Sequence, residues 1–127
     1  MRINIEFIPA VEQRYPTCGD YWIDERGDWQ IRVSNMQDDR SMKAVAIHEL
    51  EEMILVVQRG IPIESIDKFD MLFEQQRRPN EDIEPGDSPA APYHEEHTFA
   101  TAAERQLCEA QKLSWTGHCA IVKASLA

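Results

Sequence analysis

The chain has 127 residues, with 13 lysines and arginines against 23 aspartates and glutamates, and a formal net charge of −10 at pH 7. This length suits one hydrophobic core, so we expect residues 1–127 to form a single domain. The acidic balance argues against nucleic acid or an anionic membrane as the main partner and is compatible with divalent metal ions.

Other bulk features favour a cytoplasmic protein. The longest apolar run, Met53 to Val57, is far too short to cross a bilayer, and the N-terminus lacks the apolar segment of a signal peptide. The cysteines Cys18, Cys108 and Cys119 are odd in number and far apart. They fit reduced thiols better than a disulfide framework or a thiolate zinc site.

Extended segments come first along the chain. Residues 2–8 alternate between apolar and polar side chains, which is the period of a half-buried strand. Residues 20–25 and 28–34 are rich in aromatic and β-branched side chains and flank a turn at Arg26-Gly27. Together these segments predict a small antiparallel β-sheet.

Three main helices are predicted after the sheet. The first covers residues 42–59 and ends at Gly60, and the second opens at Pro62 and continues to about residue 77. The third covers residues 93–112, and residues 119–126 could form a short final helix. The sequence therefore predicts an α+β fold, with the sheet packed against three main helices.

The segment between the second and third helices, residues 79–92, is rich in proline and acidic residues. This composition predicts a loop rather than packed structure. At 14 residues it is long for a loop in a compact domain, and such loops occur near functional sites or in linkers.

The first helix contains the sequence His48-Glu49-Leu50-Glu51-Glu52. One helical turn separates His48 from Glu52, so both side chains leave the same face and can reach one point. Two ligands at this spacing, with an intervening glutamate as general base, are the geometry of a zinc-peptidase helix. Glu52 stands where the familiar motif has a second histidine. The motif therefore predicts a metal site, with Glu49 as the candidate base.

Aliphatic residues flank this polar stripe on the helix. Val45, Leu55 and Val56 occupy positions where a surface helix would carry polar side chains. His48 and Glu52 are therefore expected to be at least partly buried, and a buried charge needs a partner or a metal. The alternative is a core histidine capped by a neighbouring carboxylate.

The third helix carries a second candidate constellation. His94 and His97 are three residues apart, which is a ligand spacing. Glu104 follows His97 by two turns, as another ligand or as an outer residue that orients a ligand. The alternative is that both histidines are solvated at a helix start. His118 lies outside both motifs and is expected to be exposed in the tail.

The second helix adds a stripe of carboxylates at Asp67, Asp70 and Glu74. Asp70 lies between Phe69 and Met71, so it is a candidate ligand or imidazole partner. The alternative is a solvated acidic face.

A small sheet, a His-Glu-x-x-Glu helix and a carboxylate-bearing helix resemble a minimal zincin, the metallopeptidase-like fold. In addition, residues 48–52, 69–70, 84–87 and 92–101 resemble a family of uncharacterised proteins from bacteriophages and their bacterial hosts. This resemblance covers most of residues 29–115. It implies a phage or prophage origin, and hence the cytoplasm of a bacterial host, but no particular reaction.

The first functional hypothesis is a zincin-like, metal-dependent hydrolase of peptide or amide bonds. One divalent ion, with zinc as the first expectation, would be bound by His48 and Glu52, with His94 or His97 completing the set. Glu49 would take a proton from water activated by the metal. The partner would be a peptide or protein, with neither nucleic acid nor membrane involved.

The second hypothesis is a catalytically silent metal-binding or protein-interaction domain, acting as a phage accessory protein. A carboxylate ligand neutralises more of the metal's charge than histidine does, which weakens the ion as a Lewis acid. A third possibility is a two-metal site that also uses Asp70 and Glu104. Metal stoichiometry distinguishes these hypotheses.

Overall fold

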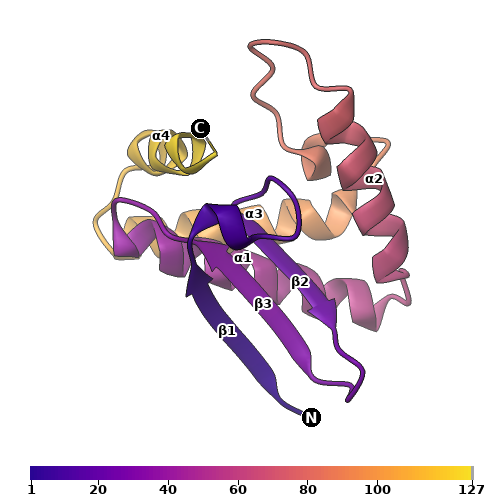
Figure 1. Cartoon of the computed structure of the whole chain (residues 1–127). Helices are drawn as coiled ribbons and strands as arrows, with labels where there is room; N and C mark the ends of the chain where they lie inside the picture. Colours follow the sequence, from indigo (N-terminus) through magenta and orange to yellow (C-terminus); the bar gives the residue numbers. More distant parts are fainter. Residues whose placement is uncertain (127) are drawn as a thin grey trace.

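The computed structural model describes residues 1–126 and confirms the predicted α+β class (Figure 1). The strands of its three-stranded sheet are β1 (Ile3–Ile8), β2 (Gly19–Ile23) and β3 (Trp29–Ser34). Its α-helices are α1 (Asp39–Gln58), α2 (Ile63–Gln75), α3 (His94–Ala110) and α4 (Trp115–Ser125). Two short 3-10 turns are η1 (Ala10–Glu12) and η2 (Pro85–Asp87).

The ends of the helices follow local signals. The side chain of Asp38 accepts a hydrogen bond from Arg40 N and caps the start of α1, while Gly60 follows its end at a φ of +69°. The predicted short final helix is a full element, because the Ser114 side chain accepts a hydrogen bond from Gly117 N and starts α4 four residues earlier than expected.

The sheet is mixed, with the strand order β1-β3-β2. β2 and β3 pair antiparallel as predicted, but β1 pairs parallel with β3, so the expectation of a wholly antiparallel sheet was wrong for β1. Residues 9–18, with η1, carry the chain from the end of β1 across to the far edge (Figure 1). The row Ile5–Ile31–Tyr21 lies on one face of the sheet.

α1 packs on that face, and α3 packs along α1 (Figure 1). The core between α1 and the sheet is aliphatic, with Ile31, Val33, Met53 and Val56 fully buried. Because α1 is held by both the sheet and α3, its polar stripe is fixed at the junction between them.

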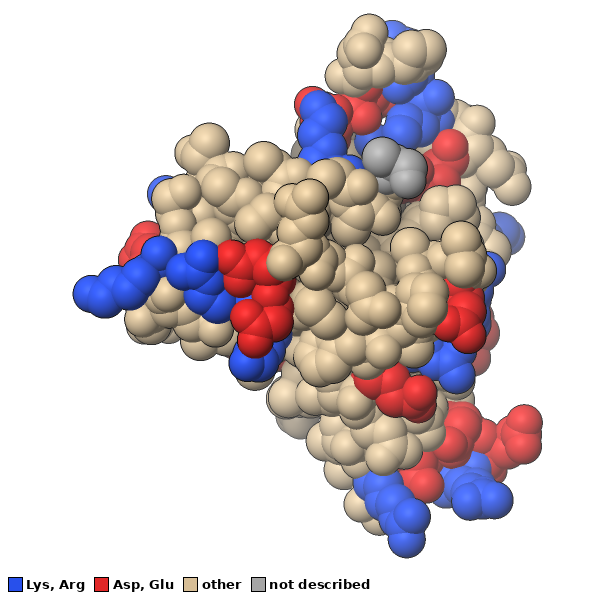
Figure 2. Space-filling view, turned by 60° about the vertical axis from the view of Figure 1, so that its left-hand side comes forward, with Lys and Arg blue, Asp and Glu red and all other residues tan. Residues whose placement is uncertain are grey.

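The β1 side of the molecule has a different surface. Figure 2 brings this side forward and shows a broad uncharged area, with acidic and basic side chains around its margin. Within residues 1–126, no helix combines the length and apolar character needed to cross a membrane.

Candidate metal centre

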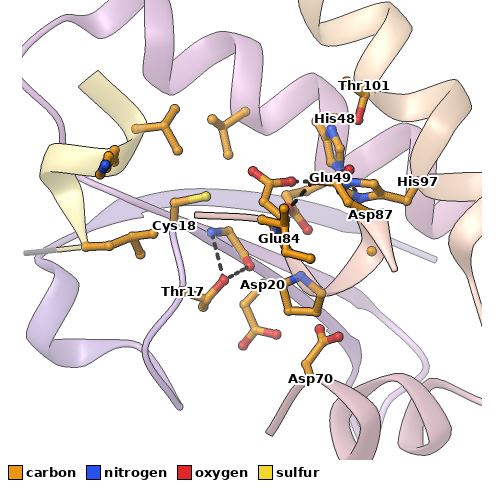
Figure 3. Close-up of a pocket in the computed structure, with 18 of the residues that line it drawn as sticks. Thr17, Cys18, Asp20, His48, Glu49, Asp70, Glu84, Asp87, His97 and Thr101 are labelled. Carbon is orange, nitrogen blue, oxygen red and sulfur yellow. Dashed lines mark hydrogen bonds and ion pairs between the residues drawn. The ribbon is translucent and has the colours of Figure 1, made fainter. Parts of the chain in front are cut away.

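Three side chains from two neighbouring helices converge on one point. His48 and Glu52 leave α1 one turn apart, and His97 comes from α3. His48 Nε2 lies 3.0 Å from Glu52 Oε2 and 3.2 Å from His97 Nδ1, and Glu52 Oε2 lies 2.9 Å from His97 Nδ1. All three residues are buried, and the two imidazoles meet beside Glu49 (Figure 3). These three side chains could hold a metal ion.

The spacing of the three donor atoms fits a tetrahedral ion. Ligands about 2.0–2.2 Å from zinc lie roughly 3.3–3.5 Å from one another at tetrahedral angles. The observed 2.9–3.2 Å comes within a few tenths of an ångström of that value. In addition, two imidazole nitrogens 3.2 Å apart repel through their lone pairs unless a proton or a cation lies between them. Two imidazoles and a carboxylate are also a common donor set for zinc.

The electrostatics of the cluster favour bound positive charge. Burial alone would lower the pKa of His48, but contacts with Glu104 and Glu52 outweigh it and raise that pKa well above its ordinary value. The same balance, with Asp87 and Glu52 as partners, raises the pKa of His97 to about 12. Burial would raise the pKa of Glu52, yet its hydrogen bonds to His48 and His97 lower it to about 2. The site therefore holds protons tightly, and a metal ion would have to displace them.

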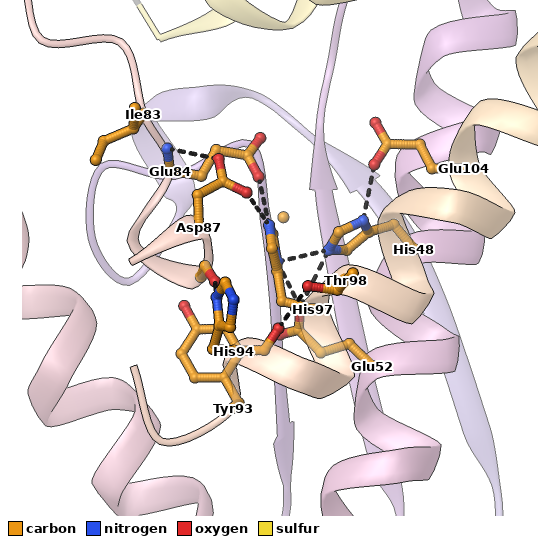
Figure 4. A network of polar contacts seen from close by, with 12 residues as sticks. His48, Glu52, Ile83, Glu84, Asp87, Tyr93, His94, His97, Thr98 and Glu104 are labelled. Carbon is orange, nitrogen blue, oxygen red and sulfur yellow. Dashed lines mark hydrogen bonds and ion pairs between the residues drawn. The ribbon is translucent and has the colours of Figure 1, made fainter. Parts of the chain in front are cut away.

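A second layer of side chains orients His48. Glu104 on α3 places Oε1 2.7 Å from His48 Nδ1, within ion-pair distance, so the carboxylate favours the proton on Nδ1 and leaves Nε2 to face the cluster (Figure 4). This is the orienting role that the sequence left open for Glu104. Burial raises the pKa of Glu104, but its contacts with His118 and His48 bring the pKa below its ordinary value.

The prediction that His118 is exposed was wrong. His118 on α4 is 1% exposed, with Nε2 2.5 Å from Glu104 Oε2 and Nδ1 2.9 Å from Ser41 Oγ. Ser41 and Glu104 are thus hydrogen-bonded to the two ring nitrogens of His118, and the other oxygen of Glu104 lies at ion-pair distance from His48. The sequence offered little signal for this chain of contacts, because a lone histidine in an unassigned tail has no spacing partner.

The acidic loop, residues 79–92, contacts His97 on the side of the ring that faces away from His48 and Glu52. Glu84 Oε2 and Asp87 Oδ1 both lie 3.1 Å from His97 Nε2, and these two half-exposed carboxylates form a second possible metal-holding group with His97 (Figure 4). The expectation that residues 79–92 are unpacked was wrong for η2, where Gly86 is buried. A Cβ at Gly86 would overlap the imidazole of His97, so glycine is what allows this close approach.

Gly86→Ala should therefore displace His97 and lower metal affinity by at least about 10-fold, with roughly 1–3 kcal/mol of lost stability from overpacking. Competition with a chromophoric chelator measures the affinity, and urea unfolding measures the stability. Pro89→Ala, an exposed change in the same segment, is the matched control and should alter neither. Equal zinc affinity in the two variants would contradict this packing.

Glu49 lies in the same cavity as the cluster. The cavity has a volume of about 1060 Å³ and is lined by residues that include His48, Glu49, Glu52 and His97 (Figure 3). Burial, followed by the charge of Glu52, raises the pKa of Glu49 well above its ordinary value. Gly19 makes room for this side chain, because a Cβ there would lie 2.5 Å from Glu49 Oε1. Neither Gly19 nor Gly86 was identified as a site residue from the sequence.

Two other candidates have different places in the structure. His94 is outside the cluster, with Nδ1 2.9 Å from Gly86 O, so it holds η2 against α3. Asp70 neither joins the cluster nor contacts an imidazole. It accepts hydrogen bonds from Tyr93 OH at 2.5 Å and Tyr15 OH at 3.4 Å.

The half-buried position of Asp70 should make the stability of the protein depend on pH. Burial raises its pKa to about 7. The folded protein therefore binds this proton more tightly than the unfolded chain does. The stability due to Asp70 is fully present below its unfolded pKa of about 3.9 and is lost as the pH rises through 7.

Asp70→Asn should remove this dependence while keeping an acceptor for Tyr93. Urea unfolding of both metal-free proteins from pH 4 to 8 should show the wild type losing roughly 2–4 kcal/mol relative to the variant. Parallel stability curves would contradict the assignment.

The chain was compared with known proteins in sequence and in structure. No protein-family model, curated protein or solved structure matches it. The residues and geometry of the site are therefore the basis for inferring a function.

Proposed function

We propose that the chain is a metal-dependent hydrolase of peptide or amide bonds, with one zinc ion bound by His48, Glu52 and His97. The supporting observation is that three donor atoms, 2.9–3.2 Å apart, line a cavity of about 1060 Å³. Catalytic zinc sites have three protein ligands and an open position, whereas structural zinc sites are closed by four.

In this proposal Glu49 is the general base. A bound divalent ion supplies Lewis-acid chemistry, because it polarises a carbonyl oxygen and makes water more acidic. Glu49 follows the ligand His48 directly and lies in the same cavity. Its raised pKa makes its carboxylate a stronger base than an exposed glutamate. Glu104 keeps His48 in the orientation that presents Nε2.

The arrangement of His97 supports one ion per chain. Its Nδ1 faces His48 and Glu52, while its Nε2 faces Glu84 and Asp87. A neutral imidazole carries one proton and so has one nitrogen free to bind a metal. Occupation of both groups would require His97 to lose both protons, so a stoichiometry of two is the less favoured outcome.

A catalytically silent metal-binding or interaction domain is the second candidate, and one observation favours it. Glu84 and Asp87 already reach the imidazole of His97. If either carboxylate also bound the ion, the open position would be filled and the site would become a closed, structural one.

A peptide-cleavage experiment distinguishes the two candidates. The zinc-loaded protein and a chelator-treated sample are incubated with a mixture of unstructured peptides, and products are identified by mass spectrometry. The proposal predicts cleavage that depends on zinc. One bound zinc per chain without cleavage of any peptide would favour the silent alternative. No zinc binding would exclude both metal-binding versions and leave the interaction domain.

We also propose a phage or prophage origin, action in the cytoplasm of a bacterial host, and a peptide or protein partner. The sequence resemblance given above supports the origin. The acidic composition supports a partner other than nucleic acid.

A further inference from the structure

We propose that two copies of this chain form a symmetric dimer by pairing their β1 strands. The two strands would run antiparallel around a two-fold axis centred on Asn4 and join the two sheets into one continuous sheet. This inference is independent of the metal site and rests on the free edge, the apolar face and the charge pattern of β1.

Among the residues that the structure describes, no strand pairs with the outer edge of β1. β1 is an edge strand, because β3 pairs with one of its sides and the strand order ends there. Arg2 O accepts from Trp29 N and Ile8 O accepts from Asn35 N, each at 2.8 Å, so even-numbered residues turn their backbone groups toward β3. By the alternation of a strand, the N–H and C=O groups of the odd-numbered residues point to the open edge.

The apolar side chains of β1 are unusually exposed for an isolated edge. Ile3, Ile5 and Phe7 are 43%, 39% and 41% exposed. Ile5 and Phe7 share the sheet face on which α1 buries Ile31 and Val33. Protein edges are normally protected by a proline, a bulge or an inward-pointing charge, and the apolar face of β1 has none of these. A second copy of β1 would cover this apolar face. It would also form hydrogen bonds with the N–H and C=O groups at the open edge.

Charge complementarity selects both the partner and the register. With the axis at Asn4, Arg2 lies opposite Glu6 of the second copy, and the pair occurs twice. Ile3 then lies opposite Ile5, so the apolar face is continuous across the axis. Moving the axis to Glu6 would place two glutamates opposite each other, which is unfavourable. The order of charged and apolar side chains along β1 is complementary to the same order read in the opposite direction. A second copy of β1 is therefore the strand that pairs best with this edge.

A further apolar stripe can contribute to the interface. Ile47 and Ile54 on α1 are 39% and 45% exposed. At 100° per residue they lie on the side of α1 turned away from His48 and α3. A two-fold axis through the β1 edge places both α1 helices on the same face of the joined sheet. This stripe supplies apolar area toward the approximately 800 Å² per partner of a standard interface.

A charge-exchange experiment tests the pairing on the full chain. Sedimentation equilibrium should show a monomer–dimer equilibrium for the wild type. Arg2→Glu and Glu6→Arg should each raise the dimer dissociation constant by at least 10-fold. The double variant Arg2→Glu/Glu6→Arg should restore dimerisation, because the two charges exchange places. Circular dichroism of each variant confirms that the fold is kept.

Cross-linking tests the register. Residues opposite each other at a non-hydrogen-bonded position of an antiparallel pair have Cα atoms about 4.5 Å apart, within disulfide range. In a Cys119→Ser background, Asn4→Cys should give a disulfide-linked dimer on mild oxidation, and the matched variant Glu6→Cys should not. A wild type that stays monomeric at every concentration overturns the proposal. So does a dimer that tolerates both single charge reversals, because another surface or partner strand would then be responsible.

Discussion

His48→Ala is expected to abolish metal retention. The imidazole supplies Nε2, which lies 3.0 Å from Glu52 Oε2 and 3.2 Å from His97 Nδ1, so its loss leaves two ligands. Loss of a residue that only orients a metal ligand lowers metal affinity by about 10–100-fold. Loss of a ligand itself should therefore lower the affinity by more than about 100-fold. The metal-dependent gain in stability should vanish as well. For the wild type, that gain is about 2.7 kcal/mol at a free metal concentration 100 times the Kd.

The measurement is zinc content after desalting, together with thermal unfolding at several zinc concentrations. His94→Ala is the matched control, because His94 lies one turn before His97 on α3 but outside the cluster. It should retain zinc and its dependence of Tm on zinc. Normal zinc content and unfolding in His48→Ala would remove this residue from the site.

Glu49→Gln is expected to keep the metal and lose hydrolysis. The amide has nearly the same shape but cannot accept the proton, so the rate of zinc-dependent cleavage should fall by about 10²–10⁴-fold. The comparison uses the peptides cleaved by the wild type, with zinc content measured in the same samples. Glu51→Gln, on the same helix outside the cavity lining, is the matched control and should cleave normally. If Glu49→Gln loses zinc instead, Glu49 is a ligand and another group is the base.

Local signals in the sequence were enough to predict α1 and its motif. Apolar residues flanking His48 and Glu52 implied burial, and the two residues are each 4% exposed. The predicted meeting of His48 with the third helix is also confirmed, through His97. The choice between His94 and His97 depends on the rotation of α3 about its own axis. Packing against α1 sets that rotation, and spacing alone cannot reveal it.

Other features depend on contacts between distant segments. The parallel pairing of β1 is decided by where residues 9–18 cross the sheet, and no local pattern marks this path. The role of His118 requires α4 to fold back onto α3 and α1. Gly86 was visible only as part of a turn, and its importance follows from the position of His97.

Zinc-edge anomalous diffraction from crystals of the zinc-loaded protein would locate the ion among the three donor residues. We expect one anomalous peak per chain, about 2.0–2.2 Å from His48 Nε2, a carboxylate oxygen of Glu52 and one imidazole nitrogen of His97. A chain without such a peak, or with zinc bound only by other residues, would contradict the proposed metal centre.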